Sequence, residues 1–286
     1  VKALVLVDDT YVDGVAIGGT IGGVEIISAK AITGDPAVGT QLLTIDAQIE
    51  TQLGDAIAAL AQSPLRNQIG PLADWQYSGE ADAKLHLEIP LKQIPGKAIT
   101  GDYLVNAKLR GGSVDIPNTP ISISQLKGGL NFSVADGLYS EDITGEFWQQ
   151  PLSAKLFRTG KQQKVAISTA VEPESLSKLV KFPWTKVLTG TIPIEGLLSI
   201  NGADAPSSGV TLQLVSQMEA SEVKLPAPLK KVAGESRALD VTLHFDPDFQ
   251  RLEGRIGDQL VTDLRFNQSQ MTHGLVSFDR SVSVPE

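Results

Sequence analysis

The chain has 286 residues, of which 42% are hydrophobic and 20% are charged, and its net charge is −9. This composition suits a folded protein that buries a core, as one extended domain or as two smaller ones. The acid excess disfavours binding to nucleic acid or to anionic lipid head groups, because both need clustered basic residues. The chain has no cysteine, which excludes disulfides, thiolate metal sites and a cysteine nucleophile. It also has no apolar run near the roughly 20 residues of a membrane-spanning helix.

Short runs rich in Val, Ile, Leu and Thr, separated by Gly and Pro, recur along the chain and are typical of an all-β meander. In residues 43–50, apolar Leu, Ile and Ala alternate with polar residues. Residues 81–91 continue this alternation without a break, and residues 239–245 repeat it. Because successive side chains of a strand point to opposite faces, each of these strands has one dry face and one wet face.

Two segments interrupt the strand pattern and predict short helices. Residues 53–65 place Ile57 and Leu60 at helical spacing, and residues 174–180 follow a proline and place two leucines three apart. After each helix come a tryptophan, a glycine and an alternating strand. This recurrence predicts two β-meander units, residues 1–172 and 173–286; one continuous extended domain is the alternative.

The sequence offers no catalytic constellation. His86 and His244 fall on the polar faces of alternating strands, and His273 lies in a turn-like segment, so all three are expected to be surface residues. No two of them have the sequence spacing of metal ligands. Asp246-Pro247-Asp248 lacks the further acidic positions of a calcium loop and is better explained as a turn. We therefore predict no enzyme activity, no metal and no cofactor; an enzyme that uses two acids is the weakest hypothesis, because no acid pair has a suitable context.

The remaining feature is the aliphatic dry face, which must be covered by a second layer or by a ligand. If the sheet is closed, these residues form an ordinary core. If the sheet is curled and open, they line a groove for acyl chains, in which each buried methylene contributes roughly 0.8 kcal/mol. The candidate groove residues are Leu43, Ile45, Ile49, Leu85, Leu87, Ile89, Leu212, Leu214, Leu243 and Phe245.

One stretch has a more specific pattern than the strands. Residues 225–239 contain Leu-Pro-Ala-Pro-Leu, followed by Lys231, Glu235 and Leu239. This pattern resembles a signature of the large AsmA-like envelope proteins, and is closest to the YhdP branch. The strand at 85–91 and the segment 121–156 resemble further parts of that family, in the same order, so the similarity covers roughly residues 52–279.

The resemblance implies an internal section of a longer protein, anchored in the inner membrane of a Gram-negative cell and lying mostly in the periplasm. The fold it implies is all-β, a mostly antiparallel, curled sheet that forms a hydrophobic groove, with a few short helices. The function it implies is phospholipid transport between the inner and outer membranes, with acyl chains as the partner. The alternative is a non-catalytic scaffold module of the cell envelope that binds other envelope proteins.

Overall fold

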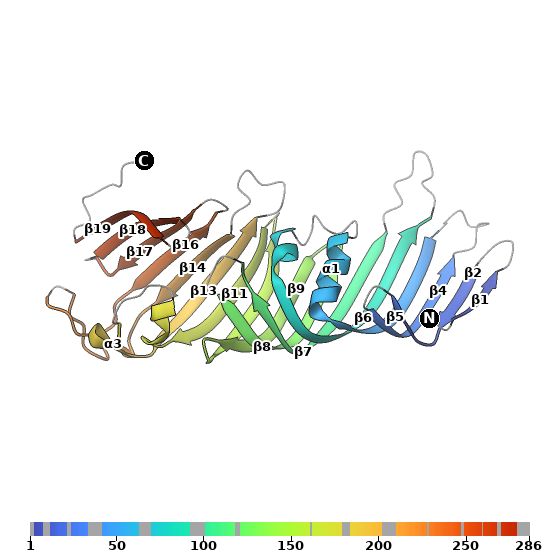
Figure 1. Ribbon diagram of the computed structural model, residues 1–286, viewed down its shortest axis with the longest axis horizontal. Helices are drawn as coiled ribbons and strands as arrows, with labels where there is room; N and C mark the ends of the chain where they lie inside the picture. The colour runs from blue at the N-terminus through green and yellow to red at the C-terminus, as the bar shows by residue number, and fades with distance from the viewer. Residues whose placement is uncertain are drawn as a thin grey trace. The chain divides into compact units, whose positions relative to one another are not determined.

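The computed structural model describes residues 3–7, 12–21, 24–33, 42–62, 70–91, 101–117, 121–160, 162–178, 184–201, 210–227, 229–246, 249–258, 260–267 and 270–278. Among the described residues, strands make up 72% and helices 9%, and the strands pair antiparallel (Figure 1). The predicted fold class, an all-β antiparallel curled sheet with few short helices, is therefore confirmed.

The chain divides into two compact units. Unit 1 consists of residues 1–117 and 124–143, and unit 2 of residues 118–123 and 144–286. The division near residue 172, which the helix–tryptophan–glycine recurrence suggests, stays a prediction.

The strands that lie wholly or mostly in unit 1 follow one another along the chain, and most pair with a strand next to them in sequence. Their bounds are β1 Ala3–Val7, β2 Val12–Ala16, β3 Gly19–Ile21, β4 Val24–Thr33, β5 Leu42–Gln52, β6 Gln76–Pro90, β7 Asp102–Asp115, β8 Ser122–Ser133 and β9 Gly137–Phe147. An antiparallel ladder runs from β1 through β2, β4, β5 and β6 to β7, and the short β3 pairs with β4. Such a meander needs only local connections, as the frequent turn residues predict.

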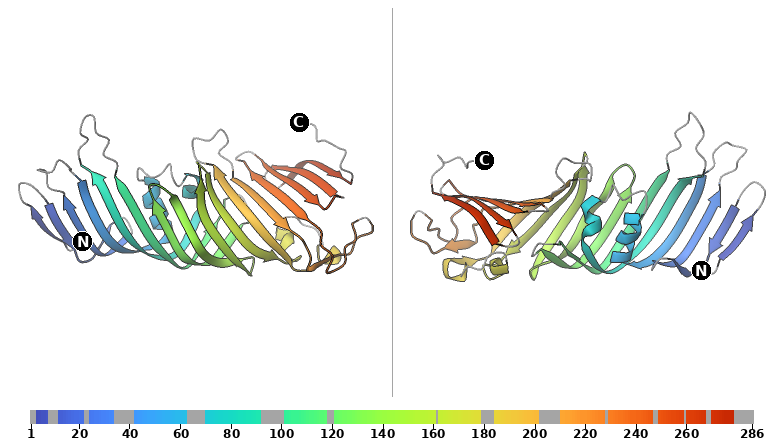
Figure 2. Two further views of the ribbon diagram at one scale, coloured as in Figure 1. Left: turned by 180° about the vertical axis from the view of Figure 1, so that it is seen from behind. Right: turned by 45° about the horizontal axis from the view of Figure 1, so that its top comes forward.

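A helix covers part of one face of this ladder. The helix α1 (Leu53–Gln62) follows β5 directly and packs on β5 and β6, with η2 (Gly70–Asp74) beside it. It lies in front of the strands in Figure 1 and behind them in the left view of Figure 2. Leu53 and Ile57, four residues apart on one side of the helix, are buried. The helix predicted at residues 53–65 is thus present, and its predicted last three residues lie outside the described part of the chain.

Unit 2 repeats the antiparallel arrangement. Its strands are β10 Gln150–Thr159, β11 Gln162–Val171, β12 Leu188–Gly190, β13 Ile192–Asn201, β14 Val210–Ser216, β15 Ser221–Val223, β16 Leu239–Phe245, β17 Gln250–Ile256, β18 Leu260–Asn267 and β19 Gln270–Ser277. The ladder runs β10, β11, β13, β14, β16, β17, β18, β19, while β12 and β15 form a separate pair.

Short helical turns and the β12–β15 pair bury one end of unit 2. The predicted helix at residues 174–180 appears as a 3-10 turn, η3 (Ser175–Lys178), and α3 (Trp184–Val187) follows it. Val171, Ile192 and Met218 form a buried cluster there, against which Leu176 and Val187 pack.

The glycines of the predicted recurrence share a backbone role. Gly79 in β6 and Gly190 at the end of β12 both have positive φ, of 94° and 85°. A Cβ on Gly79 would overlap the backbone of Gly112, and one on Gly190 would overlap the backbone of Ala220. Each glycine therefore permits a close approach of two strands that other residues would prevent.

Candidate apolar groove

The register of unit 1 brings its six candidate groove residues onto one face. Leu43 lies opposite Ile89, and Ile45 lies opposite Leu87. The same face continues into β7, where Tyr103 and Val105 oppose residues of β6. Further cross-strand pairs on this face are Ala47 with Leu85, Ile49 with Ala83, Thr51 with Ala81, Leu85 with Val105, Leu87 with Tyr103, Ala83 with Ala107, and Ala81 with Leu109.

In unit 2 the four candidate residues also share a face. Leu212 lies opposite Leu243, Leu214 opposite Val241, and Val210 opposite Phe245. The pair Leu212–Leu243 belongs to a longer row of aliphatic residues that crosses seven strands. In strand order this row is Leu156, Val165, Leu198, Leu212, Leu243, Leu252 and Leu264.

These apolar faces contain no charge over most of their area. In unit 1, every described residue of the face on β5, β6 and β7 between the ends of the ladder is apolar, Thr, Gly or Tyr. In unit 2, the described residues of the face from β11 to β18 add only Gln, Ser and Thr. Such a surface favours an aliphatic ligand and gives little for a polar ligand to bind.

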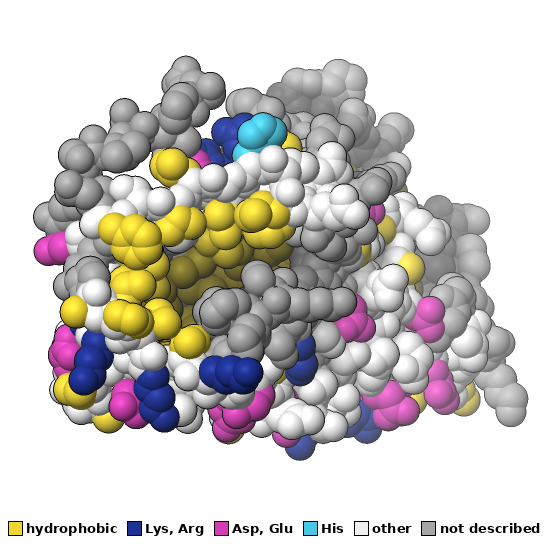
Figure 3. Space-filling view, turned by 60° about the vertical axis from the view of Figure 1, so that its left-hand side comes forward, with side chains coloured by type: hydrophobic (Ala, Val, Ile, Leu, Met, Phe, Trp, Pro, Cys, Tyr) yellow, Lys and Arg dark blue, Asp and Glu magenta, His cyan; other side chains and the backbone are white. Residues whose placement is uncertain are grey.

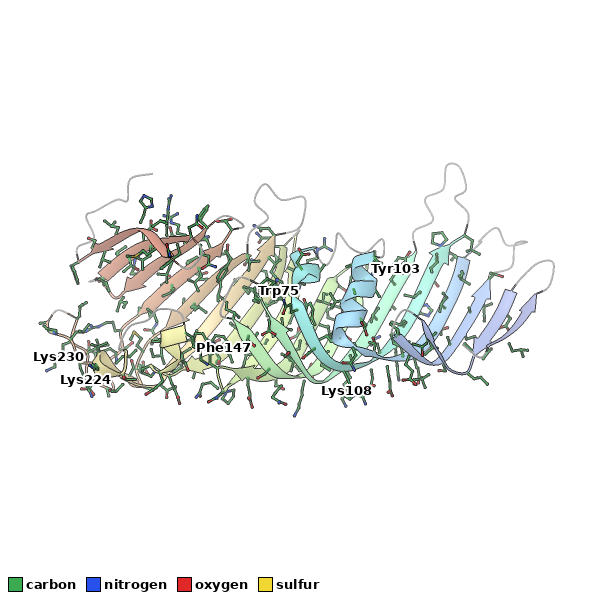
Figure 4. All side chains as sticks on the ribbon, in the orientation of Figure 1. Trp75, Tyr103, Lys108, Phe147, Lys224 and Lys230 are labelled. Carbon is green, nitrogen blue, oxygen red and sulfur yellow. The ribbon has the colours of Figure 1, made fainter. Side chains whose placement is uncertain are left out.

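The opposite faces hold the charged side chains and pair them with one another. In unit 1, Asp46 accepts a hydrogen bond from His86 at 2.7 Å, and this bond raises the pKa of His86. Arg110 lies 2.7 Å from Asp82 on the same side. Figure 4 shows Lys108, from the same polar face of β7, pointing away from the sheet. His86 and His244, predicted to be surface residues, are thus ion-pair partners on the wet side, and His244 lies 3.3 Å from Glu253 in unit 2. His273, predicted to lie in a turn, is instead an exposed residue of β19.

A charged pair in unit 2 is better shielded. Asp263 is only 7% exposed and accepts two hydrogen bonds from Arg251, at 2.9 and 2.6 Å. These bonds hold the pKa of Asp263 below its usual range, although its partial burial opposes the effect. The pair lies on the polar face, because Asp263 is the register partner of Glu253, which shares its face of β17 with Arg251.

Coverage of the apolar faces is uneven. In unit 1, α1 packs on β5 and β6, and Ala81 and Ala83 of β6 are buried, with 2% and 8% exposed, whereas Leu85, Leu87 and Ile89 are half-buried. In unit 2 the burial of the long row decreases from β14 to β18. Leu212 is buried, and Leu243, Leu252 and Leu264 are half-buried. Figure 3 shows a hollow lined by hydrophobic side chains at the end of the molecule that includes β16–β19.

The sequence argument missed several residues that share these faces. Tyr103 and Val105 on β7, and Leu198, Leu252 and Leu264 in unit 2, belong to the same rows as the candidates. Their strands have the alternating pattern, so extending the same count to every strand would have identified them. The second aspartate of the Asp246-Pro247-Asp248 turn lies outside the described residues, as does its proline.

The Leu-Pro-Ala-Pro-Leu pattern forms a loop that is held by buried cations. We call residues 224–237 the signature loop. Lys231 is 1% exposed and donates a hydrogen bond to the Ser221 carbonyl at 2.7 Å; burial lowers its pKa. Arg237 donates to the carbonyls of Leu229 and Lys230, at 2.9 and 2.7 Å. Figure 4 shows Lys224 and Lys230 at the outer tip of this loop, so the signature fixes a turn and places no charge on the apolar face.

Fold and surface together define a class, that of curled antiparallel β-sheet proteins with one charge-free aliphatic face that is partly uncovered. The chain belongs to the YhdP family, whose model, described as YhdP protein, matches residues 1–286. It is 27% identical over 279 residues to the intermembrane phospholipid transporter YhdP of Escherichia coli (strain K12). The resemblance inferred from the sequence is confirmed.

The match covers 93% of this chain and 20% of the relative, so the chain spans about a fifth of the length of the curated protein it matches. No solved structure matches the chain. None of the helices in the described ranges is both long and apolar enough to cross a membrane.

Proposed function

We propose that this chain is a section of an envelope lipid-transport protein and that its apolar faces hold phospholipid acyl chains in the periplasm, between the inner and outer membranes. The full-length protein would be anchored in the inner membrane. The observation that supports this most is the uncharged aliphatic row from Leu156 to Leu264, which stays half-buried from β16 onward. The name of the E. coli relative supports phospholipid as the cargo.

The mechanism is passive retention of tails. An aliphatic face binds a tail through its methylenes, at roughly 0.8 kcal/mol for each one buried, without a specific polar contact. Because the charged residues lie on the opposite faces, head groups would remain in water at the open rim. No step requires a nucleophile, a proton donor or a metal, and movement along the row exchanges one aliphatic contact for another.

The test is native mass spectrometry of the chain purified without detergent, followed by lipid extraction. We expect co-purifying phospholipid in the wild-type protein. Leu87→Asp and Leu243→Asp should each reduce it several-fold, because a carboxylate buried beside a tail loses its hydration. The matched controls are Gln48→Asp and Gln213→Asp, which place the same carboxylate at exposed positions of the polar faces.

Circular dichroism of each variant verifies that it is folded. A folded wild-type chain that contains no lipid and takes up no labelled phospholipid would contradict the proposal, and would favour a closed scaffold module that binds envelope proteins. Equal lipid loss in the polar-face controls would also contradict it, since the effect would then be independent of the face.

A further inference from the structure

We propose that α1 sets the length of acyl chain that unit 1 accepts, by closing one end of its apolar face. This inference rests on the proposed function, because it assumes that the face holds tails. It assigns to the helix a role in selecting among phospholipids by their tails, whatever their head groups.

The covered and open parts of the face meet at a sharp boundary. Along β6 the apolar positions are Ala81, Ala83, Leu85, Leu87 and Ile89. The two alanines are almost fully buried, and α1 packs on this strand through its buried Leu53 and Ile57. Small side chains allow a helix to approach a sheet closely, so the alanines mark the footprint of α1. The three larger residues beyond it are half-buried.

The half-buried part of the face extends along three neighbouring strands, β5, β6 and β7. The register places Leu85 between Ala47 and Val105, and Leu87 between Ile45 and Tyr103. From Leu85 to Ile89 the chain advances four residues, which is about 14 Å at the rise of a β-strand.

This depth matches the length of a phospholipid tail. The hydrocarbon core of a bilayer is roughly 30 Å thick, so one leaflet of tails is about 15 Å deep. A tail that lies along β6 with its head group at the Ile89 end would therefore reach α1 with its terminal methyl. The register partners Glu88 and Asp102 at that end lie on the opposite, polar face, so the described residues of the apolar face carry no charge there. A longer tail would have to bend or leave methylenes in water.

If α1 acts as a stop, the affinity for phospholipid should rise with tail length and then reach a plateau. Each methylene that becomes buried should increase the affinity about fourfold, up to the length at which the tail reaches α1. Further methylenes should then add little, because α1 prevents their burial. A face without a stop would give a continuous increase.

The experiment uses the full chain in a Leu243→Asp background, which reduces the contribution of unit 2 to the lipid bound. The protein is incubated with phosphatidylcholines that have two identical saturated tails of twelve to twenty carbons, and bound lipid is quantified by native mass spectrometry. Ile57→Ala shortens a buried side chain of α1 and should therefore move the plateau to longer tails. Val105→Phe fills the first open row and should move the plateau to shorter tails.

The matched control is Asn106→Phe, which adds the same ring on the exposed polar face one residue further along β7. It should leave the plateau where it is in the background protein. Val105→Phe lies at a half-buried position, so it keeps the inference testable if Ile57→Ala fails to fold. A continuous increase with tail length, or one plateau shared by all variants, would overturn the role of α1. Absence of lipid from the wild-type chain would instead overturn the proposed function.

Discussion

At the scale of single residues, the fold depends on a few positions at which no other side chain fits. Gly79 combines a positive φ with an approach to Gly112 so close that a Cβ has no space. Gly234 in the signature loop also has a positive φ, of 86°, but nothing lies within 4 Å of a Cβ added there. A substitution at Gly234 therefore introduces conformational strain alone, whereas a substitution at Gly79 introduces both strain and steric overlap.

We expect Gly79→Ala to destabilise the protein more than Gly234→Ala does. Positive φ costs a non-glycine residue roughly 1–2 kcal/mol at either site. Overpacking against Gly112 adds typically 1–3 kcal/mol at Gly79 alone. Urea unfolding followed by tryptophan fluorescence measures both changes. Equal destabilisation by the two substitutions would show that the β6–β7 contact relaxes without cost.

The shielded Asp263–Arg251 pair makes the stability of the folded protein depend on pH, in a direction that follows from the lowered pKa of Asp263. Because the pKa of Asp263 is lowered in the folded state, the stabilisation by its carboxylate is complete above the unfolded pKa, near 3.9. It is lost as the pH falls from there through the folded pKa. The cationic groups that act on it are Arg251 first, then Arg265 and His244.

Asp263→Asn should therefore cost about 1–3 kcal/mol at neutral pH. The stability difference from the wild type should shrink as the pH is lowered below about 4. Urea midpoints at pH values between about 3 and 7 measure this. Asp240→Asn, at an exposed position on the same polar face, is the control and should change stability little. A difference that is constant with pH would exclude the ionised pair as its source.

At the scale of elements, the signature loop shows how a sequence motif can be structural. The side chain of Arg237 is 10% exposed and holds two carbonyls of the loop, while the Lys231 amide donates to the Val223 carbonyl at 3.1 Å. Pro226 restricts the backbone, and the guanidinium supplies donors to carbonyls of the loop.

Arg237→Ala should loosen this loop and leave the ladders intact. Losing hydrogen bonds from a charged donor costs about 1.5–3 kcal/mol each. Amide exchange at Lys231 should therefore accelerate by roughly 10- to 100-fold, while exchange in β13 stays unchanged. Hydrogen exchange with mass spectrometry resolves the two segments. Arg255→Ala, at an exposed position on β17, is the control; acceleration in β13 as well would mean that the loop is coupled to the whole of unit 2.

Among the elements, strands were more predictable than helices. The period-two pattern of residues 43–50, 81–91 and 239–245 correctly placed β5, β6 and β16, because alternation is a property of the local backbone. The helix at residues 53–65 was also found, because Ile57 and Leu60 have helical spacing. The second predicted helix is only a 3-10 turn, since a segment so short depends on the cluster against which it packs.

At the scale of the whole molecule, neighbouring strands present their aliphatic residues on one face in each unit, and covering elements bury only a part of it. The aspartate substitutions at Leu87 and Leu243 therefore probe a property of whole faces rather than of a local pocket. Their effect on bound lipid should be similar in the two units, because each face lacks charge in its described rows.

The sequence by itself determined the fold class, the face to which each candidate residue points, and the family. These follow from two-residue periodicity and from a motif read along the chain, and neither needs distant contacts. Only the tertiary structure decided which rows align across strands, that Leu252 and Leu264 extend the row through Leu243, and that Ala81 and Ala83 are buried in a strand against which α1 packs while Leu85 is half-buried. The reason is that register and coverage depend on contacts between residues far apart in sequence, which strand periodicity does not encode.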